Sequence, residues 1–199
     1  MDKGNELPKR KRLRWEGFDY STPGGYFITI CTKDRKPIFG PVGADSISAS
    51  LVERTFLETI NQYRNVECPI YVVMPNHFHA IIVILDQDAI SRADMESAPT
   101  GAGMARADME SAPTGAGMAR ADMESAPTVS EIVQAFKRYS TIEYINLVKK
   151  GILPPFDKQI WQRSFYDHVI RNRDDFEQTA KYIYENPMRW YYDELYSDE

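Results

Sequence analysis

The sequence predicts an α+β protein in which an antiparallel sheet carries helices on one face. Apolar segments with the period-two alternation of strands are interspersed with segments that have helical apolar spacing. Their order is β-α-β-β-α-β followed by one final helix, which is typical of a ferredoxin-like sandwich. At 199 residues, of which 43% are hydrophobic, the chain has the length and composition of one domain with a sizeable core.

Each element follows from a local pattern. Helical spacing of apolar residues covers residues 51–64 and 129–149. Strand-like patterns cover residues 26–32, residues 68–84 in two halves around Pro75 and Asn76, and residues 161–170.

A last helix is predicted from about Asp174 to Pro187. Two acidic residues, Asp174 and Asp175, suit its first turn. Proline disfavours helical geometry in the residue before it, so we expect the helix to stop there. On this helix Tyr182 and Asn186 are four residues apart and share one face.

Two histidines, His77 and His79, are two residues apart in the second half of the 68–84 segment. Side chains alternate between the two faces of a strand, so these imidazoles lie side by side on one face. Each buried nitrogen needs a partner, and a metal ion would supply one for both rings. A His-x-His pair is also common among structural and surface histidines, so the spacing alone leaves that interpretation open.

These side chains together predict a metal-assisted nucleophilic site. The ion would be held by His77, His79 and the side-chain oxygen of Asn186, with open positions for a phosphate oxygen. Tyr182 would then attack the phosphorus. A tyrosine hydroxyl with a pKa near ~10 is a weak nucleophile at neutral pH, so the metal must polarise the phosphate.

Three motifs in a fixed order resemble the single-tyrosine HUH transposases. They are Pro-Asn-His-Phe-His at residues 75–79, Trp-Gln-Arg-Ser-Phe-Tyr-Asp-His-Val-Ile-Arg-Asn at 161–172 and Tyr-Ile-Tyr-Glu-Asn-Pro at 182–187. The likeness is closest to the REP-associated tyrosine transposases, domesticated relatives of small bacterial insertion-sequence transposases. It spans about residues 15–192, apart from one insertion.

The resemblance implies both the chemistry and the partner. It implies that His77 and His79 hold Mg²⁺ or Mn²⁺, with Asn186 as the third ligand. Tyr182 would become linked to a DNA 5′ phosphate, with release of a 3′ hydroxyl, and the substrate would be single-stranded DNA folded into hairpins. The implied function is a metal-dependent DNA endonuclease or transposase that can also rejoin strands.

Other interpretations stay open. A hairpin-binding module without catalytic activity would keep only the DNA surface, and a hydrolase would use activated water in place of Tyr182. The REP-associated members point to a monomer with its site in cis, in the bacterial cytoplasm at the nucleoid. A homodimer in which the tyrosine helix serves the partner's site is also compatible with the sequence.

Three residues near the predicted site have structural alternatives. Tyr184 is on a different helix face from Asn186, and we expect its ring to pack. Asparagine near a helix end is a common terminator, so Asn186 can equally be a cap. His168 is expected to be a structural histidine with satisfied nitrogens, and its facing is left open.

The net charge of −5 is unevenly distributed. A fourteen-residue unit that begins at Arg92 recurs at Arg106, and its first nine residues recur at Arg120. This repeat contains no aromatic residue, so we expect residues 92–128 to form a flexible insertion. The repeat contributes −3 and an acidic tail at 193–199 contributes −4, which leaves +2 for the remainder.

We expect the basic residues to contact the DNA backbone from two places, an N-terminal arm at residues 1–14 and the predicted second helix. Trp15, which follows the arm, could stack on a base. The candidate DNA-binding residues are Lys9, Arg10, Lys11, Arg12, Arg14, Lys137 and Arg138. The catalytic domain would then span residues 15–192, interrupted by the repeat.

Cysteine content and hydropathy point to a cytoplasmic protein. Cys31 and Cys68 are too few for a disulfide framework and have no zinc-finger spacing, so we expect reduced thiols. The sequence has no apolar run of about eighteen residues that would span a membrane, and its N-terminus does not resemble a signal peptide.

Overall fold

The computed structural model describes residues 19–42, 46–86 and 127–197. A four-stranded antiparallel sheet, in the order β2-β3-β1-β4, forms the centre. Its strands are β1 (Gly24–Cys31), β2 (Val66–Met74), β3 (His77–Ile84) and β4 (Tyr166–Ile170). The helices are α1 (Ile47–Ile60), α3 (Val129–Lys149) and α4 (Arg173–Glu185), with short 3-10 helices at Lys33–Arg35 and Asn186–Tyr192.

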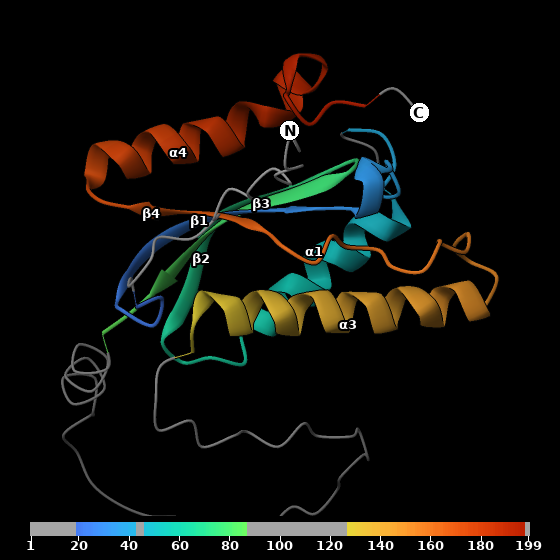
Figure 1. Ribbon diagram of the computed structural model, residues 1–199, viewed down its shortest axis with the longest axis horizontal. Coiled ribbons are helices and arrows are strands. Elements are labelled where there is room, and N and C mark those ends of the chain that lie inside the picture. Colours follow the sequence, from blue (N-terminus) through green and yellow to red (C-terminus); the bar gives the residue numbers. More distant parts are fainter. Residues whose placement is uncertain (1–18, 43–45, 87–126, 198–199) are drawn as a thin grey trace, which may run out of the picture.

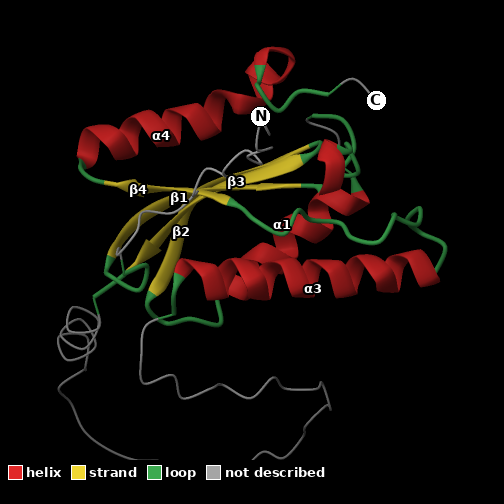
Figure 2. Ribbon diagram, in the orientation of Figure 1, coloured by secondary structure: helices red, strands yellow, loops and turns green. Residues whose placement is uncertain are grey.

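Helices cover both faces of this sheet. Figure 1 shows α1 and α3 on one face and α4 on the other, and Figure 2 shows the same layers by secondary structure. The element order and strand order are those of a ferredoxin-like sandwich with an added C-terminal helix. The predicted fold class is therefore confirmed.

Alternation along the strands separates a hydrophobic core from a polar site. The residues of β3 that face α1 and α3 include Phe78 and Ala80, both fully buried. The Phe78 ring lies 4.6 Å from that of Phe56 on α1 and 5.4 Å from that of Phe136 on α3, measured between centroids. Because the intervening residues of the same strand point the other way, the histidines face α4.

The predicted boundaries hold best where a local cap fixes them. Thr128 Oγ1 accepts a hydrogen bond from the Glu131 backbone N–H, and the Glu131 carboxylate accepts one from the Thr128 N–H. This capping box starts α3 at Val129, the residue predicted from the sequence. The strand predicted at 161–170 is shorter, because only Tyr166–Ile170 pairs with β1, while Trp161 forms an isolated bridge to Thr32.

The expected effect of Pro187 on the residue before it is wrong. Asn186 keeps helical geometry, with φ −54° and ψ −43°. The chain passes into the 3-10 helix Asn186–Tyr192, with Pro187 in its first turn. Proline is tolerated there because the first backbone N–H groups of a helix have no internal partner to lose.

Two predicted segments fall outside the described residues. They are the basic N-terminal arm, with Lys9, Arg10, Lys11, Arg12, Arg14 and the adjacent Trp15, and all of the 92–128 repeat except its last two residues. Within the described ranges, the structure contains no helix long and apolar enough to cross a bilayer. The two cysteines are free thiols.

Candidate metal and tyrosine site

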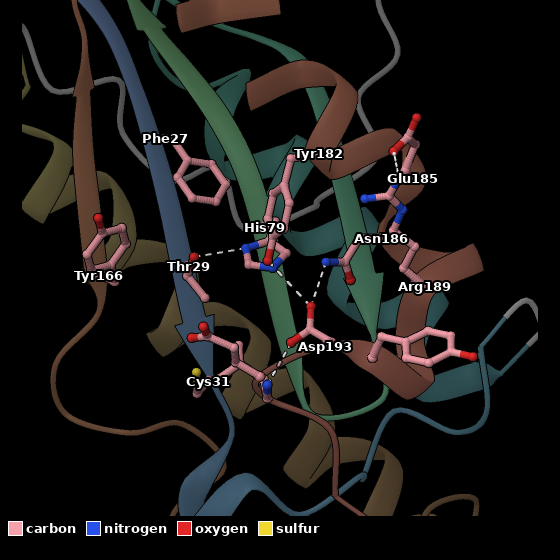
Figure 3. A pocket seen from close by; sticks show the side chains of 13 residues that line it. Phe27, Thr29, Cys31, His79, Tyr166, Tyr182, Glu185, Asn186, Arg189 and Asp193 are labelled. Atoms are coloured by element: carbon pink, nitrogen blue, oxygen red, sulfur yellow. Dashed lines mark hydrogen bonds and ion pairs between the residues drawn. The ribbon is translucent and has the colours of Figure 1, made fainter. Parts of the chain in front are cut away.

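A cavity of about 730 Å³ lies between the sheet and the C-terminal part of the chain. Strands β1 and β3 provide its floor, and α4 with the segment that follows it provides the wall (Figure 3). The lining residues are Phe27, Thr29, Cys31, His79, Tyr166, Tyr182, Glu185, Asn186, Arg189, Tyr192, Asp193, Glu194 and Leu195. The cavity thus joins residues that are far apart in the sequence.

His77 and His79 lie side by side on β3, as their spacing predicts. Their ring centroids are 4.5 Å apart, and both side chains are buried, with 0% and 1% of their surface exposed. The Nε2 atom of each ring is buried and has no hydrogen-bond partner among the described residues. A buried polar atom without a partner is costly in a folded protein, so these two nitrogens call for a ligand.

The hydrogen bonds of Asn76 determine which nitrogen of His77 carries the proton. The Asn76 Nδ2 group donates to the backbone oxygens of Arg35 at 3.1 Å and Leu195 at 2.7 Å. These oxygens only accept, so the amide oxygen of Asn76 is the atom that faces His77 Nδ1, at 2.8 Å. His77 therefore donates from Nδ1, and its Nε2 carries a free lone pair suited to a metal.

His79 is held in a similar way. Its Nδ1 is 2.8 Å from the hydroxyl of Thr29, which faces it across the β1–β3 ladder. The Phe27 ring stacks on the imidazole, with centroids 5.3 Å apart and an angle of 27°. These contacts orient the ring and leave Nε2 for a ligand.

Burial keeps both imidazoles neutral. It lowers the pKa of His77 from 6.5 to about 4, although the charge of Asp193 and the Asn186 side chain partly offset this effect. Burial, together with the neighbouring His77, holds the pKa of His79 well below its usual value. The neutral imidazole is the form that binds metal ions, so the pair is ready to act as ligands at neutral pH.

Tyr182 lies over His79 from α4 (Figure 3). Its ring is 5.3 Å from the His79 ring and 6.0 Å from the Phe27 ring, and 46% of the residue's surface is exposed. Its hydroxyl donates a long hydrogen bond of 3.4 Å to Asp193 Oδ2. Burial, followed by the charge of Asp193, raises the pKa of Tyr182 to about 12, so the phenol is protonated at neutral pH.

Asn186 shares the face of Tyr182, as the spacing of four predicts. Its side chain is 2% exposed, and its Nδ2 donates to Asp193 Oδ2 at 2.8 Å. Its Oδ1 is buried without a hydrogen-bond partner in the described part of the chain. This oxygen is therefore a candidate ligand, and Asn186 also ends α4, so the two predicted roles are compatible.

Asp193 is a functional candidate that the sequence analysis missed. One of its carboxylate oxygens and one nitrogen from each of His77 and His79 all lie within 4.8 Å of one another. The sequence places Asp193 in the predicted acidic tail at residues 193–199, directly after the segment that forms the 3-10 helix Asn186–Tyr192. The turn of this 3-10 helix brings Asp193 back under Tyr182. Such a turn cannot be predicted from the periodicity of strands or helices.

Tyr184 and His168 do not line the cavity. Tyr184 is 73% exposed, so the expectation that its ring packs is wrong, because its face of α4 points to solvent. His168 Nε2 lies 3.0 Å from both carboxylate oxygens of Asp175, which joins β4 to the first turn of α4. This contact supports the structural interpretation of His168 for its Nε2 atom.

The two basic residues predicted on the second helix lie away from the cavity. Helix α3 is on the opposite face of the sheet from α4 (Figure 1). The ammonium group of Lys137 donates to the backbone oxygens of Gln162 at 2.9 Å and Ser164 at 3.0 Å, and Arg138 lies over the Tyr139 ring. A DNA-binding role for Lys137 and Arg138 stays a prediction.

The donor set fits a divalent ion. Two imidazole nitrogens suit transition ions, and an amide oxygen with a carboxylate suits Mg²⁺ and Mn²⁺. The unpartnered atoms of His77, His79 and Asn186 support the same fit, since an ion would satisfy all of them.

Comparisons with known proteins agree with this fold. No protein-family model matches the chain. Over 193 residues it is 28% identical to an uncharacterized protein of Haemophilus influenzae. The alignment covers 95% of this chain and 94% of that protein. The solved structure of a REP-associated tyrosine transposase bound to a REP hairpin matches 88% of this chain and 74% of that chain, with a TM-score of 0.52 and 17% sequence identity. This chain therefore has the fold of a REP-associated tyrosine transposase, as the three sequence motifs implied.

Proposed function

We propose that this chain is a transposase-like enzyme that cleaves hairpin-containing single-stranded DNA through a covalent bond between Tyr182 and a 5′ phosphate. The observation that carries the proposal is the pair of unpartnered Nε2 atoms of His77 and His79, with the Tyr182 ring 5.3 Å from the His79 ring. A purely structural histidine pair would have both nitrogens of each ring satisfied.

The donor atoms of the site would hold Mg²⁺ or Mn²⁺ through His77, His79 and Asp193, with the Asn186 side-chain oxygen as a further ligand. The bound ion would polarise a phosphate oxygen and stabilise negative charge on phosphorus. Because the phenol of Tyr182 has a raised pKa, such charge stabilisation is needed for its attack.

The residues of the chain would carry out the transfer itself. The Oη–P bond to Tyr182 forms as the bond from phosphorus to the 3′ oxygen breaks, and the leaving 3′ oxygen takes up a proton from water and departs as a free 3′ hydroxyl. The hydrogen bond to Asp193 orients the hydroxyl and provides an acceptor for its proton. The reverse reaction, attack of a 3′ hydroxyl on the phosphotyrosine, would rejoin strands.

The arrangement also supports a cis site. Tyr182 lies over the histidines of its own chain, so a monomer contains every residue that the reaction needs. Hairpin DNA is the proposed partner because the structural relative is described as bound to a REP hairpin, and the three motifs resemble that family. An enzyme of this kind would act on DNA in the cytoplasm, at the nucleoid.

The test is a denaturing gel of the protein with labelled hairpin DNA and Mg²⁺ or Mn²⁺. The wild type and the matched control Tyr184→Phe, which changes an exposed tyrosine on the same helix, should both give a protein-linked DNA band. Tyr182→Phe should give none. Cleavage that persists in Tyr182→Phe without a linked band would instead indicate a hydrolase, and binding without cleavage would indicate an inactive hairpin-binding module.

A further inference from the structure

Two aromatic side chains line the sheet side of the cavity, beside the candidate metal ligands. Phe27 on β1 and Tyr166 on β4 belong to neighbouring strands, in which Phe27 is opposite His168 and Thr29 is opposite Tyr166. This register places Phe27 and Tyr166 on the same face of the sheet as the histidine pair. Figure 3 shows the Phe27 ring beside Tyr182 and the Tyr166 ring farther out, on the other side of Phe27.

The two rings differ in how they are held. The Phe27 ring is held between the rings of two candidate site residues. It stacks on His79 and meets the Tyr182 ring edge-on at 89°, with centroids 6.0 Å apart. Tyr166 meets Phe27 at 69° and 6.5 Å, yet 49% of its surface is exposed. Packing of the core therefore does not account for Tyr166, which extends an aromatic surface from the site toward solvent.

We propose that Tyr166, supported by the ring of Phe27, stacks one unpaired base of the nucleotide that flanks the phosphate attacked by Tyr182. Every base has a π face, so aromatic side chains bind single-stranded DNA by stacking with little sequence preference. The proposal rests on the proposed function, and it identifies the substrate at this point as an unpaired nucleotide.

The geometry restricts which nucleotide binds there. The Phe27 ring lies 6.0 Å from the Tyr182 ring and 6.5 Å from the Tyr166 ring, so it connects the nucleophile to the proposed stacking surface. A base stacked on Tyr166 would therefore belong to a nucleotide close to the reacting phosphate. The cavity of about 730 Å³ is in the range of pockets that enclose small ligands, and Phe27 and Tyr166 contribute aromatic rings to its lining. A base inside a duplex is already paired and stacked, so it would have to leave the helix first.

The test measures binding, so that turnover is not required. Full-length protein carrying Tyr182→Phe is titrated with a hairpin that has a single-stranded thymidine extension, with 2-aminopurine replacing one thymidine at a time. Stacking on an aromatic ring should quench the fluorescence at one position. Adding Tyr166→Ala should remove this quenching and weaken the Kd by about tenfold or more, while Tyr166→Phe should preserve both.

The control is Tyr184→Ala, which removes an exposed tyrosine of α4 that does not line the cavity, and it should change neither the quenching nor the Kd. Unchanged quenching and affinity in Tyr166→Ala would overturn the stacking surface and leave the proposed function standing. Quenching that depends on Tyr166, in a protein whose wild type forms no covalent adduct, would support the surface and refute the proposed chemistry. If the protein that carries Tyr182→Phe and keeps Tyr166 does not bind the hairpin extension, both the stacking surface and the proposed function would be overturned.

Discussion

Replacing Asp193 with asparagine should separate its two proposed contributions. Asp193→Asn removes the negative charge but keeps the size of the side chain. The carboxylate now accepts hydrogen bonds from Asn186 Nδ2 at 2.8 Å and from the Leu195 N–H at 2.7 Å. The amide oxygen of the variant can keep one of these bonds, so the local fold should persist.

The expected loss in metal affinity can be worked from the spacing of the donor atoms. They lie within 4.8 Å of one another, so an ion held among them would be about 2.8 Å from the carboxylate oxygen. At that distance a divalent ion and a carboxylate attract by about 12 kcal/mol at an effective dielectric constant of ~20. Dehydration of the ion and of the half-buried carboxylate offsets most of this attraction. A net of ~1.4–2.7 kcal/mol remains, which corresponds to a ten- to hundredfold weaker Kd for Mn²⁺.

The assay is calorimetric titration of the metal-free protein with Mn²⁺. The matched control is Asp174→Asn, which removes the same charge from the first turn of α4, at the end of the helix away from the site (Figure 1). This control should bind Mn²⁺ as the wild type does. An unchanged Mn²⁺ affinity in Asp193→Asn, combined with slower adduct formation, would refute the ligand assignment and leave Asp193 as the proton acceptor of the tyrosine.

Three further outcomes are expected. In a thermal melt, saturating Mn²⁺ at about a hundred times Kd should raise the Tm of the wild type by roughly 5–10 °C. The same Mn²⁺ concentration should leave the Tm of the His77→Ala variant unchanged. Phe78→Ala should lower the free energy of unfolding in urea by about 3–5 kcal/mol, because Phe78 is fully buried on the core face; a much smaller loss would contradict the assigned facing. Hydrogen bonds from the Arg171 backbone N–H and from His168 hold the pKa of Asp175 in the folded protein below 3.8, so Asp175→Asn should destabilise the protein above pH 3.8. The difference in stability from wild type should disappear as the pH falls through the pKa of Asp175 in the folded protein. A difference in stability that does not change with pH would exclude this linkage.

The parts of the site that were predicted from sequence follow from regular periodicity. His77 and His79 share a face because strand side chains alternate, and Tyr182 and Asn186 share a face because helix neighbours recur after four residues. The fold followed in the same way from the order of such periodic segments. These predictions needed only the identity of each element, and they tolerate errors of a few residues at its ends.

The parts that were missed depend on irregular backbone or on strand register. Asp193 reaches the histidines through a 3-10 helix that begins at Asn186, where the proline rule had predicted a stop. Asn76 was recognised as a break between strands and as part of the Pro-Asn-His-Phe-His motif, but local spacing gave it no role, although its hydrogen bonds determine the tautomer of His77. Tyr166 enters the cavity because β4 pairs with β1 in one register, and a register between distant strands cannot be obtained from local spacing.

Asn76 connects the two halves of the site. The first half is rigid, because β3 is hydrogen-bonded on both sides and Phe78 packs its other face into the core. The second half is the segment after α4, which contributes Asp193 and whose backbone is bound by Asn76 Nδ2 through Leu195 O. Since the same amide also presents its oxygen to His77, one residue aligns the lone pair of a candidate metal ligand and anchors the chain that contributes the carboxylate. The hydrogen bonds of Asn76 therefore restrict the residue type at this position as strictly as the candidate ligand role restricts the histidines that follow it. An aspartate at this position would have no N–H group to donate to the backbone oxygens, and a leucine would leave His77 Nδ1 without an acceptor.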